Sequence, residues 1–375
     1  MASGRGGWPA WRLYGAIVLA TLVGAELLAR IFDWAPRVPY FGVQDNLGGS
    51  RYNHSSSGYG DLVPAQNGHW VTWFHRPYHV QTNAAGLRNS EELSDKAFRI
   101  LAVGDSQTFG LFLANEDTWP AWTENYLRQR DGSADRTQVL NAGISGYTIV
   151  DELAYLKDKA VALKPGLVVL AAFENDMFDL LKESGGARRR PAGSTSSALT
   201  NAVRAMGRNF ALVSLMEEVK TRIGFAAAEV DFRQGVHGAT GWAPPMKEDT
   251  ELAKRYTAYF HEAVALLKSH GIDLAVIFIP SAECTGLREV PSTVEPVIRA
   301  AAAETATPYL DLTPAFRTQP DPVTRLYLLQ RGPNGVLTGD GHLSREGNAF
   351  IGKTVAGWLV DQKLVPPGRH LGSHR

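Results

Sequence analysis

Residues 98–106 read FRILAVGDS, and this stretch decides the fold. The part 98–103 is a short apolar run of the kind found in strands that are buried in a parallel sheet. Gly-Asp-Ser follows directly and is typical of a turn. The stretch therefore predicts a buried strand that ends in a turn carrying Ser106.

The same pattern recurs along the chain, where apolar runs predict strands and amphipathic stretches predict helices. The further predicted strands are 138–140, 167–172, 274–279 and 309–312. The predicted helices are 119–130, 148–163, 250–270, 294–305 and 344–360. This alternation predicts a parallel sheet with helices on both faces, whose ligands bind at the carboxyl ends of the strands.

Composition excludes several classes of protein. The 375 residues include 38 basic and 38 acidic side chains, 44% are hydrophobic and 20% are charged. This is ordinary globular composition, and it excludes a disordered chain, a collagen-like rod and a disulfide scaffold. A formal charge of zero argues against a nucleic-acid binder. The lone cysteine, Cys284, excludes an intramolecular disulfide and a CxxC site.

The chain begins with a segment that is apolar enough to cross a membrane. Residues 13–25 are almost wholly apolar, and the apolar character resumes after Glu26. A full span needs about 20 residues. The stretch 13–32 reaches that length by including Glu26 and Arg30 near one end, where long side chains can reach the interface.

Arg5 and Arg12 precede this segment, so the positive-inside rule predicts a cytoplasmic N-terminus and a catalytic part outside. Two alternatives to an uncleaved anchor stay open. Val23-Gly24-Ala25 resembles the cleavage site of a signal peptide, and the segment could also be a buried helix of a soluble protein. An anchor and a cleaved signal both send the rest of the chain across the membrane.

Residues 35–95 are irregular and rich in Gly, Asn, Ser, Pro and aromatic residues. They predict an extended flank with short strands near 69–74 and 78–82. The histidines of this flank are His54, His69, His75 and His79. No HExxH motif is present, and Pro77 opposes the helix that would align His75 with His79. We therefore expect surface or packing histidines and no metal site.

Residues 177–249 interrupt the alternation of strands and helices. The low-complexity run 183–197 (ESGGARRRPAGSTSS) is followed by a helical pattern at 202–223 and a loop containing WAPP at 242–245. An insertion of this length is typical of a lid. Its three consecutive arginines could contact an acidic polysaccharide or phospholipid headgroups, although a solvated loop is the simpler interpretation. They are Arg188, Arg189 and Arg190.

Two short motifs follow predicted strands and are candidates for chemistry. In the first, residues 104–106 (GDS), Ser106 lies at the carboxyl edge of the sheet beside a helix N-terminus. Backbone N–H groups there can stabilise an oxyanion. In the second, residues 141–146 (NAGISG), Gly146 can offer its N–H to the same oxyanion. Taken singly, each motif is equally typical of a plain turn.

Two more motifs complete the set. In residues 173–176 (FEND), the Asn175 amide can donate to an oxyanion, while Asp176 can hold the loop; a helix cap is the alternative for either. In residues 340–342 (DGH), Asp340 can bond the imidazole of His342 and fix its tautomer. The opposite ring nitrogen is then free to act as a base.

In order and placement, the four motifs resemble the SGNH (GDSL-type) hydrolase superfamily. Its blocks carry a serine in GDS, a glycine, an asparagine in GxND, and an Asp/His pair near the C-terminus. The resemblance covers residues 99–359, interrupted by the insertion. It implies a flavodoxin-like three-layer α/β/α sandwich with a parallel sheet.

The resemblance also implies a role for each site residue. Ser106 would be the nucleophile, His342 the general base and acid, and Asp340 its orienting carboxylate. The Ser106 and Gly146 N–H groups and the Asn175 side chain would form the oxyanion hole. The reaction would be acyl transfer through an ester on Ser106, without a metal or an organic cofactor.

Two departures and one further likeness refine this picture. Phe173 stands where the family has glycine, and the last motif is DxH where DxxH is commoner. DxH is similar to the membrane-associated polysaccharide O-acetyltransferase branch, though esterases also have it. Residues 82–88 (TNAAGLR) are similar to bacterial membrane-anchored members linked with exopolysaccharide or envelope modification.

The function expected is that of a serine esterase, or an O-acyl (acetyl) transferase or deacylase, acting on carbohydrate esters of the envelope or exopolysaccharide. A lipid esterase of lysophospholipase type is one alternative. A non-catalytic polysaccharide-binding or assembly subunit is another, and Phe173 is its only support. A nucleotide-binding protein is disfavoured, because no GxGxxG or GxxxxGK[ST] follows a predicted strand.

These inferences give an expected organisation. Residues 1–34 form a cytoplasmic tip and membrane anchor, 35–95 the flank, and 96–375 the catalytic domain with its insertion at 177–249. The catalytic domain is expected to be periplasmic or extracellular. Its expected partners are an ester-bearing carbohydrate or lipid and the membrane, with no nucleic acid.

Overall fold

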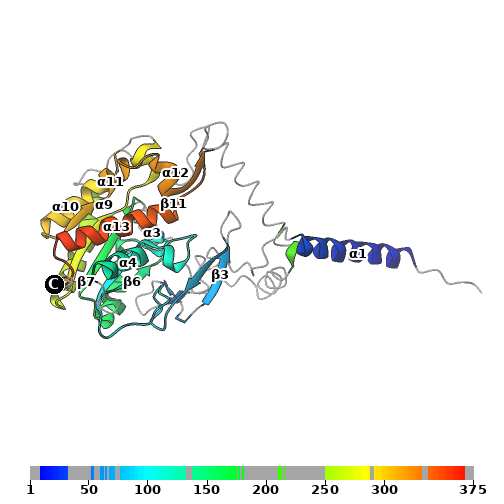
Figure 1. Cartoon of the computed structure of the whole chain (residues 1–375), viewed down its shortest axis with the longest axis horizontal. Helices are drawn as coiled ribbons and strands as arrows, with labels where there is room; N and C mark the ends of the chain where they lie inside the picture. The colour runs from blue at the N-terminus through cyan, green and yellow to red at the C-terminus, as the bar shows by residue number, and fades with distance from the viewer. Residues whose placement is uncertain are drawn as a thin grey trace, which may run out of the picture.

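The computed structural model describes two main parts of the chain, an N-terminal helix and an α/β body (Figure 1). The described residues are 9–32, 52–54, 60–62, 64–65, 67–71, 77–131, 137–174, 176–177, 180, 210–212, 215, 250–287, 291–331 and 337–367.

The centre of the body is a five-stranded sheet with the order β6-β5-β7-β8-β9. All neighbouring strands in it are parallel. The strands are β5 (Phe98–Gly104), β6 (Thr137–Gly143), β7 (Leu167–Ala172), β8 (Asp273–Phe278) and β9 (Tyr309–Asp311). This is the flavodoxin-like strand order, and its reversal lies between β5 and β7, where such sheets bind their ligands. The expected fold class is therefore confirmed.

Both faces of the sheet are buried. Alternate side chains of each strand point to opposite faces, so each strand contributes to two hydrophobic cores. On β5, Leu101 and Val103 belong to one hydrophobic core. Ile100 and Ala102 belong to the other. A strand that is buried on both sides needs a continuous apolar run, and this is why FRILAV predicts its own position in the sheet.

Two sets of helices cover the faces and complete the three layers. One face is covered by α4 (Trp119–Asp131), α11 (Thr313–Arg317), α12 (Pro322–Leu326) and α13 (Arg345–Asp361). The other is covered by α5 (Ile149–Tyr155), α9 (Glu251–Ser269) and α10 (Glu295–Glu304). The predicted helices are confirmed. In the one expected at 148–163, α5 is continued by a π-helical turn, Leu156–Ala160, and a 3₁₀ turn, Val161–Leu163.

One hairpin of the body is not predicted by the sequence pattern. Strands β10 (Tyr327–Arg331) and β11 (Leu337–Leu343) pair antiparallel outside the parallel sheet. Residues 339–341 of β11 read Gly-Asp-Gly, and these residue types are depleted in strands, so no strand was expected there. Antiparallel pairing with β10 overrides this low local propensity.

The flank contains short strands, as expected. Strand β3 (Asn67–Val71) pairs antiparallel with β4 (Pro77–Gln81), close to the two predicted positions. A second antiparallel pair joins β1 (Tyr52–His54) to β2 (Gly60–Leu62). Across the β3–β4 pair, His79 Nε2 lies 2.5 Å from Asn67 Oδ1. His75 lies outside the described residues.

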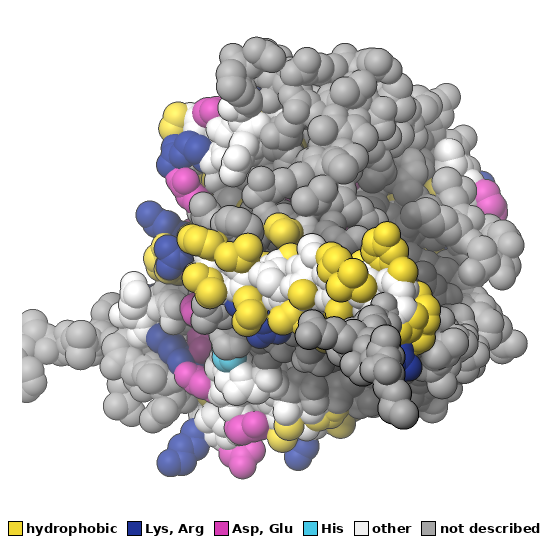
Figure 2. Space-filling model, turned by 90° about the vertical axis from the view of Figure 1, so that its right-hand side faces the viewer, with side chains coloured by type: hydrophobic (Ala, Val, Ile, Leu, Met, Phe, Trp, Pro, Cys, Tyr) yellow, Lys and Arg dark blue, Asp and Glu magenta, His cyan; other side chains and the backbone are white. Residues whose placement is uncertain are grey.

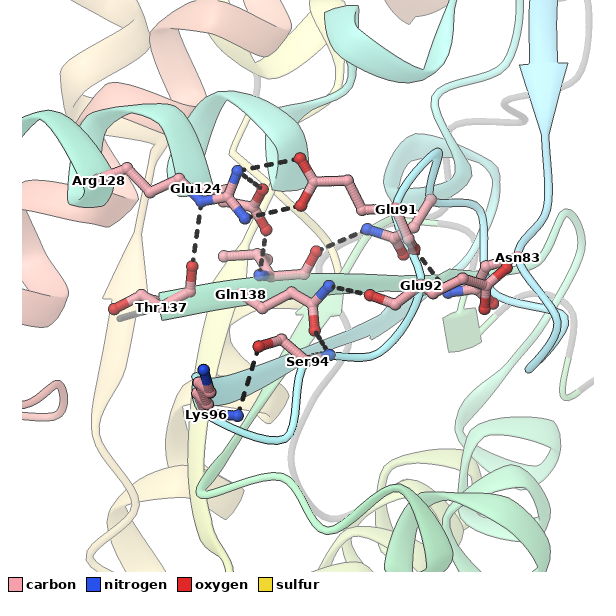
Figure 3. Close-up of polar contacts among 11 residues, drawn as sticks. Asn83, Glu91, Glu92, Ser94, Lys96, Glu124, Arg128, Thr137 and Gln138 are labelled. Atoms are coloured by element: carbon pink, nitrogen blue, oxygen red, sulfur yellow. Dashed lines mark hydrogen bonds and ion pairs between the residues drawn. The ribbon is translucent and has the colours of Figure 1, made fainter. Parts of the chain in front are cut away.

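Residues 88–94 cover the open edge of β6. Arg88 N donates to Asn141 O at 2.9 Å. The Asn89 side chain accepts from Asn141 N and donates to the carbonyl of Val139, both at 2.9 Å. Figure 3 shows Gln138, also on β6, bonded to this segment. These contacts satisfy the backbone groups that an edge strand otherwise leaves open.

Helix α1 (Ala10–Ile31) is the one described helix that is long and apolar enough to cross a membrane, with a mean hydropathy of 1.6. Its apolar side chains are exposed, and Ala29 is its only buried residue. Figure 2 views the molecule from the side on which α1 projects in Figure 1, and it shows hydrophobic side chains gathered across the middle of this view. This exposure argues against a core helix of a soluble protein.

Two parts of the predicted insertion, its start and its middle, meet different surroundings. Near its start, Met177 and Leu180 are buried in the core. In its middle, the N–H groups of Ala211 and Leu212 donate to the two carboxylate oxygens of Glu26 in α1, at 2.8 and 2.9 Å. The three arginines, the 242–245 loop and most of the helix expected at 202–223 lie outside the described residues, so the lid stays a prediction.

Candidate active site

Ser106 is the first residue of a short helix, α3 (Ser106–Phe109), that starts directly beyond β5. Asp105 precedes this helix as its N-cap, and its carboxylate accepts the Gln107 N–H at 2.8 Å. Aspartate is favoured at this position because its side chain satisfies an N–H group that the helix leaves open. Ser106 is partly exposed, whereas the residues on either side of it are buried.

The short helix lies against the end of the sheet with almost no space between them. A Cβ atom on Gly143, the last residue of β6, would lie 2.2 Å from Phe109 N and 2.5 Å from Thr108 C. Real Cβ atoms essentially never approach backbone atoms that closely, so a side chain at 143 would push α3 away. Close packing against α3 therefore explains why position 143 of the NAGISG motif is a glycine.

The hairpin β10–β11 carries the other two predicted catalytic side chains to Ser106. His342 Nε2 lies 2.8 Å from Ser106 Oγ. His342 Nδ1 contacts Asp340 Oδ1, and the backbone N–H of His342 donates to the same oxygen at 2.9 Å. Asp340 thus holds both the ring and the backbone of His342, and it favours the tautomer whose Nε2 can accept the Ser106 proton.

Gln107 was not singled out in the sequence, yet it ties the two halves of the site together. Gln107 is 3% exposed, and its Oε1 accepts the Leu343 N–H at 3.2 Å. Leu343 follows His342 on β11, and Gln107 follows Ser106 on α3. No sequence signal reveals this contact, because it depends on the hairpin meeting the helix.

The pKa values of the pair respond to each other. Burial lowers the pKa of His342, but the hydrogen bond and charge of Asp340, with the charge of Asp105, raise it to a net value above 6.5. Burial raises the pKa of Asp340, but its contacts with His342 lower it by more, to a net value below 3.8. At neutral pH, Asp340 is ionised and ready to stabilise a protonated imidazole.

Gly146 occupies a turn at the same edge of the sheet. Tyr147 N donates to Ile144 O at 3.1 Å, and Gly146, with φ of 77°, is the third residue of this four-residue turn. That position needs a positive φ in a type II turn and favours glycine. The turn follows β6, which neighbours the strand before Ser106. Its use in an oxyanion hole stays a prediction.

Asp176, the last residue of the FEND motif, has a structural role. The Phe173 N–H donates to Asp176 Oδ2 at 3.1 Å, so Asp176 holds the loop, as the sequence allowed. Glu174 is buried and accepts from Cys284 Sγ at 3.2 Å. Phe173 packs against one of the two cores. Asn175 lies outside the described residues, so its role as an oxyanion donor stays a prediction.

The arrangement can perform nucleophilic catalysis. A hydroxyl, a base within hydrogen-bond reach and a carboxylate that orients the base are the recurring parts of an activated nucleophile. His342 and Asp340 have side-chain exposures of 22% and 20%, so one side of the site is open to solvent. No group of three or more His, Cys, Asp or Glu within the described ranges is arranged to hold a metal ion.

Comparison with known proteins gives a family match. A family model described as the GDSL-like Lipase/Acylhydrolase family matches residues 102–350, more than half of the chain. A search of curated proteins finds no match.

Similar solved structures include three hydrolases at low identity. The acetyl xylan esterase AlAXEase has a TM-score of 0.40 and 16% identity, covering 70% of this chain and 98% of its own. Axe2, an acetylxylan esterase from Geobacillus stearothermophilus, has a TM-score of 0.38 and 17% identity, covering 72% and 94%. The alpha/beta hydrolase LAE5, from the metagenome of Lake Arreo, Spain, has a TM-score of 0.40 and 15% identity, covering 74% and 99%.

Proposed function

Because this chain belongs to the GDSL-like lipase/acylhydrolase family, we propose that it breaks or transfers an ester bond through an acyl-enzyme on Ser106. One observation carries the proposal. The Ser106 hydroxyl, the His342 imidazole and the Asp340 carboxylate form an unbroken line of contacts, with 2.8 Å between Ser106 Oγ and His342 Nε2.

The proposed reaction has two halves. In the first, Ser106 Oγ attacks the ester carbonyl while its proton passes to His342 Nε2, and the alcohol leaves with that proton. In the second, water or a sugar hydroxyl attacks the acyl group on Ser106, and His342 again takes and returns a proton. Water as the acceptor makes the protein an esterase or deacylase. A sugar hydroxyl makes it an O-acyltransferase.

The oxyanion of the tetrahedral intermediate needs hydrogen-bond donors. We propose that the Ser106 and Gly146 N–H groups and the Asn175 amide supply them. The start of α3 and the turn holding Gly146 follow neighbouring strands, which supports a shared position at one edge of the sheet. Removing one such donor typically lowers kcat by about 10²–10³-fold.

For the substrate we propose a carbohydrate ester of the cell envelope or of an exopolysaccharide. Two observations support this choice. The exposed apolar helix α1 suits a membrane anchor, which would keep the site near envelope polymers. The partly exposed Ser106 and His342 suit an acyl group displayed on a large polymer. A lipid ester is the second candidate, because the same anchor would also hold the site near the bilayer.

The test uses the full chain in detergent micelles with three ester substrates. These are p-nitrophenyl acetate, an acetylated xylo-oligosaccharide and a lysophospholipid, each assayed with the parent and with Ser106→Ala. Turnover of the acetyl esters that disappears in Ser106→Ala supports the proposal. A matched control, Ser269→Ala at the exposed end of α9, should keep full activity.

A fluorophosphonate probe adds a readout that does not depend on the substrate chosen. The parent should carry the probe on Ser106, and Ser106→Ala should not. A folded parent that neither turns over esters nor accepts the probe would favour the non-catalytic subunit. Preference for the lysophospholipid would favour the lipid esterase.

We also propose that α1 is an uncleaved anchor with the catalytic domain outside the cytoplasm. A reporter that is active only outside the cytoplasm, fused after residue 375, should be active. A full-length fusion with an inactive reporter would overturn this topology. The mass of the mature chain separates an anchor from a cleaved signal, because cleavage after Ala25 would remove most of α1.

A further inference from the structure

Arg88 is a charged residue buried behind the nucleophile helix. It is 1% exposed, and no carboxylate of the described residues forms an ion pair with it. Burial lowers the pKa of Arg88 to about 10, so it remains protonated at neutral pH. A buried charge is costly unless hydrogen bonds satisfy it, so the partners of this guanidinium show what it is for.

All of those partners lie between the last residue of α3, Phe109, and Asn115. Nη1 donates to the carbonyls of Phe109 and Gly110, the latter at 2.7 Å, and Nη2 donates to the carbonyl of Leu113. Nε lies 3.3 Å from Asn115 Oδ1. The guanidinium also lies 4.3 Å from the centre of the Phe109 ring. The planar fork of arginine suits several acceptors at once in a way that an ammonium group does not.

A tight turn delivers Arg88 to this position. Asn83 Oδ1 accepts the N–H groups of Ala85 and Leu87, and Asn83 N donates to Leu87 O at 3.0 Å. Gly86 has a φ of 72°, which the turn requires. Arg88 N then joins the edge of β6 at Asn141 O. Its backbone is therefore held on both sides before the side chain reaches the loop.

The loop holds one residue in an unusual conformation. Leu113 N donates to Gly110 O at 3.2 Å, and Phe112 is the third residue of this turn, with φ of 71°. Phenylalanine rarely adopts this conformation, and such residues persist only where their surroundings enforce it. The first and last residues of this turn are Gly110 and Leu113, and the carbonyls of both accept hydrogen bonds from Arg88.

The Phe112 side chain reaches the candidate active site. Its ring meets the His342 ring edge to face, with 5.6 Å between the ring centres and an angle of 90° between the planes. His342 is thus held on three sides, by Asp340 at Nδ1, by Ser106 at Nε2 and by Phe112 against the ring. An aromatic ring in this geometry stabilises the imidazole in one orientation.

We propose that Arg88 is a positioning residue of the active site, which fixes the loop Gly110–Leu113 so that Phe112 keeps the His342 imidazole aligned with Ser106. This inference rests on the proposed function. It adds a residue of the N-terminal flank to the machinery, and it gives this buried charge a role.

The test compares the parent with Arg88→Lys and Phe112→Gly, in the full chain in detergent. Glycine accepts a positive φ without strain, so Phe112→Gly removes the ring without forcing the turn to change. Misplacing a catalytic group by about 1 Å costs about 10²-fold in rate. Both variants should lose about that much in kcat, with little change in KM. Phe112→Gly should keep the parental melting temperature, whereas Arg88→Lys should lower it, because an ammonium group leaves some of the carbonyls without a donor. Lys363→Gly, at an exposed position with φ of 58°, is the matched control and should leave kcat unchanged.

A second readout does not depend on turnover. The proton shared by His342 Nδ1 and Asp340 should give a downfield NMR signal in the parent at low pH, and faster exchange should broaden it in both variants. An unchanged signal together with parental kcat in Phe112→Gly would overturn the proposal. Since this signal reports alignment in an inactive protein as well, failure of the esterase function and failure of this inference give different results.

Discussion

The backbone N–H of Leu343 donates to the side-chain oxygen of Gln107 at 3.2 Å. Each of these residues directly follows a proposed catalytic residue, Leu343 after His342 and Gln107 after Ser106. The contact therefore joins the base and the nucleophile, which come from distant parts of the chain.

Gln107→Ala should destabilise the protein and slow the reaction. The buried Leu343 N–H would lose its acceptor, which costs about 1–3 kcal/mol in the free energy of unfolding. The hairpin would also be freer to move, so kcat should fall. Urea unfolding and ester turnover measure the two effects. Gln330→Ala, at an exposed position, is the control and should change stability by less than about 0.5 kcal/mol. Equal stability of the two variants would show that the contact is unimportant.

Asp340→Asn should change both the rate and its pH dependence. Contacts with Asp340 raise the pKa of His342 against the effect of burial, so the parent should lose activity as the pH falls through a value above 6.5. Without the carboxylate, burial dominates, the pKa of His342 falls, and this acid limb should move to lower pH. The rate on the plateau should drop by about 10⁴-fold, as expected when the orienting carboxylate is lost.

The pH–rate profile of kcat/KM measures both changes. Asp361→Asn, at the exposed end of α13, should leave the profile as it is in the parent. An acid limb that stays in place in Asp340→Asn would show that Asp340 does not control His342.

Gly143→Ala and Gly357→Ala should have opposite effects. A Cβ at 143 would collide with the backbone of α3, so this variant should lose about 3 kcal/mol or more of stability and most of its activity. A Cβ at 357, on the exposed side of α13, meets no atom within 4 Å. Alanine is the better helix former, so Gly357→Ala should gain about 0.5–1 kcal/mol. Thermal unfolding of both variants checks the pair, and a stable Gly143→Ala would contradict the close approach.

Leu19→Arg should weaken membrane insertion, because Leu19 lies near the middle of α1 and its side chain is 63% exposed. An arginine at the centre of a span costs about 2.5–3.5 kcal/mol on insertion scales. The fraction of chain that resists alkaline extraction from membranes should therefore fall. Trp11→Arg, near the helix start, should have a much smaller effect. Equal extraction of the parent and Leu19→Arg would count against a spanning helix.

Most of the body could be predicted from the sequence because its signals are local. A strand buried on both faces must be apolar throughout, so LVVLAA at 167–172 marks β7. A helix between such strands must show an apolar stripe, so 250–270 marks α9 to within one residue at each end. The β10–β11 hairpin could not be predicted, because the Gly-Asp-Gly within β11 has a low strand propensity. Only pairing with β10 makes this segment a strand.

The proposed triad residues could be named from the resemblance of four motifs, taken in order, to the SGNH hydrolases. Arg88, Phe112 and Gln107 could not. Arg88 lies in the TNAAGLR stretch, which marked a likeness but no role in the site, and Phe112 and Gln107 lie outside the four motifs. Their roles depend on contacts with residues that lie far away in the sequence and become neighbours only in the folded protein.

The sequence by itself determined the alternating α/β pattern, the apolar N-terminal helix and the identity of the proposed nucleophile, base and carboxylate. The pattern and the helix follow from periodicity, which acts over a few neighbouring residues, and the three proposed site residues follow from short motifs that resemble a known family. Only the tertiary structure decided that His342 reaches Ser106 from a hairpin, that Gln107 ties that hairpin down, and that Arg88 holds the loop beside it. Such contacts join residues far apart in the chain, and side-chain packing and hydrogen-bond geometry specify them after the elements have assembled.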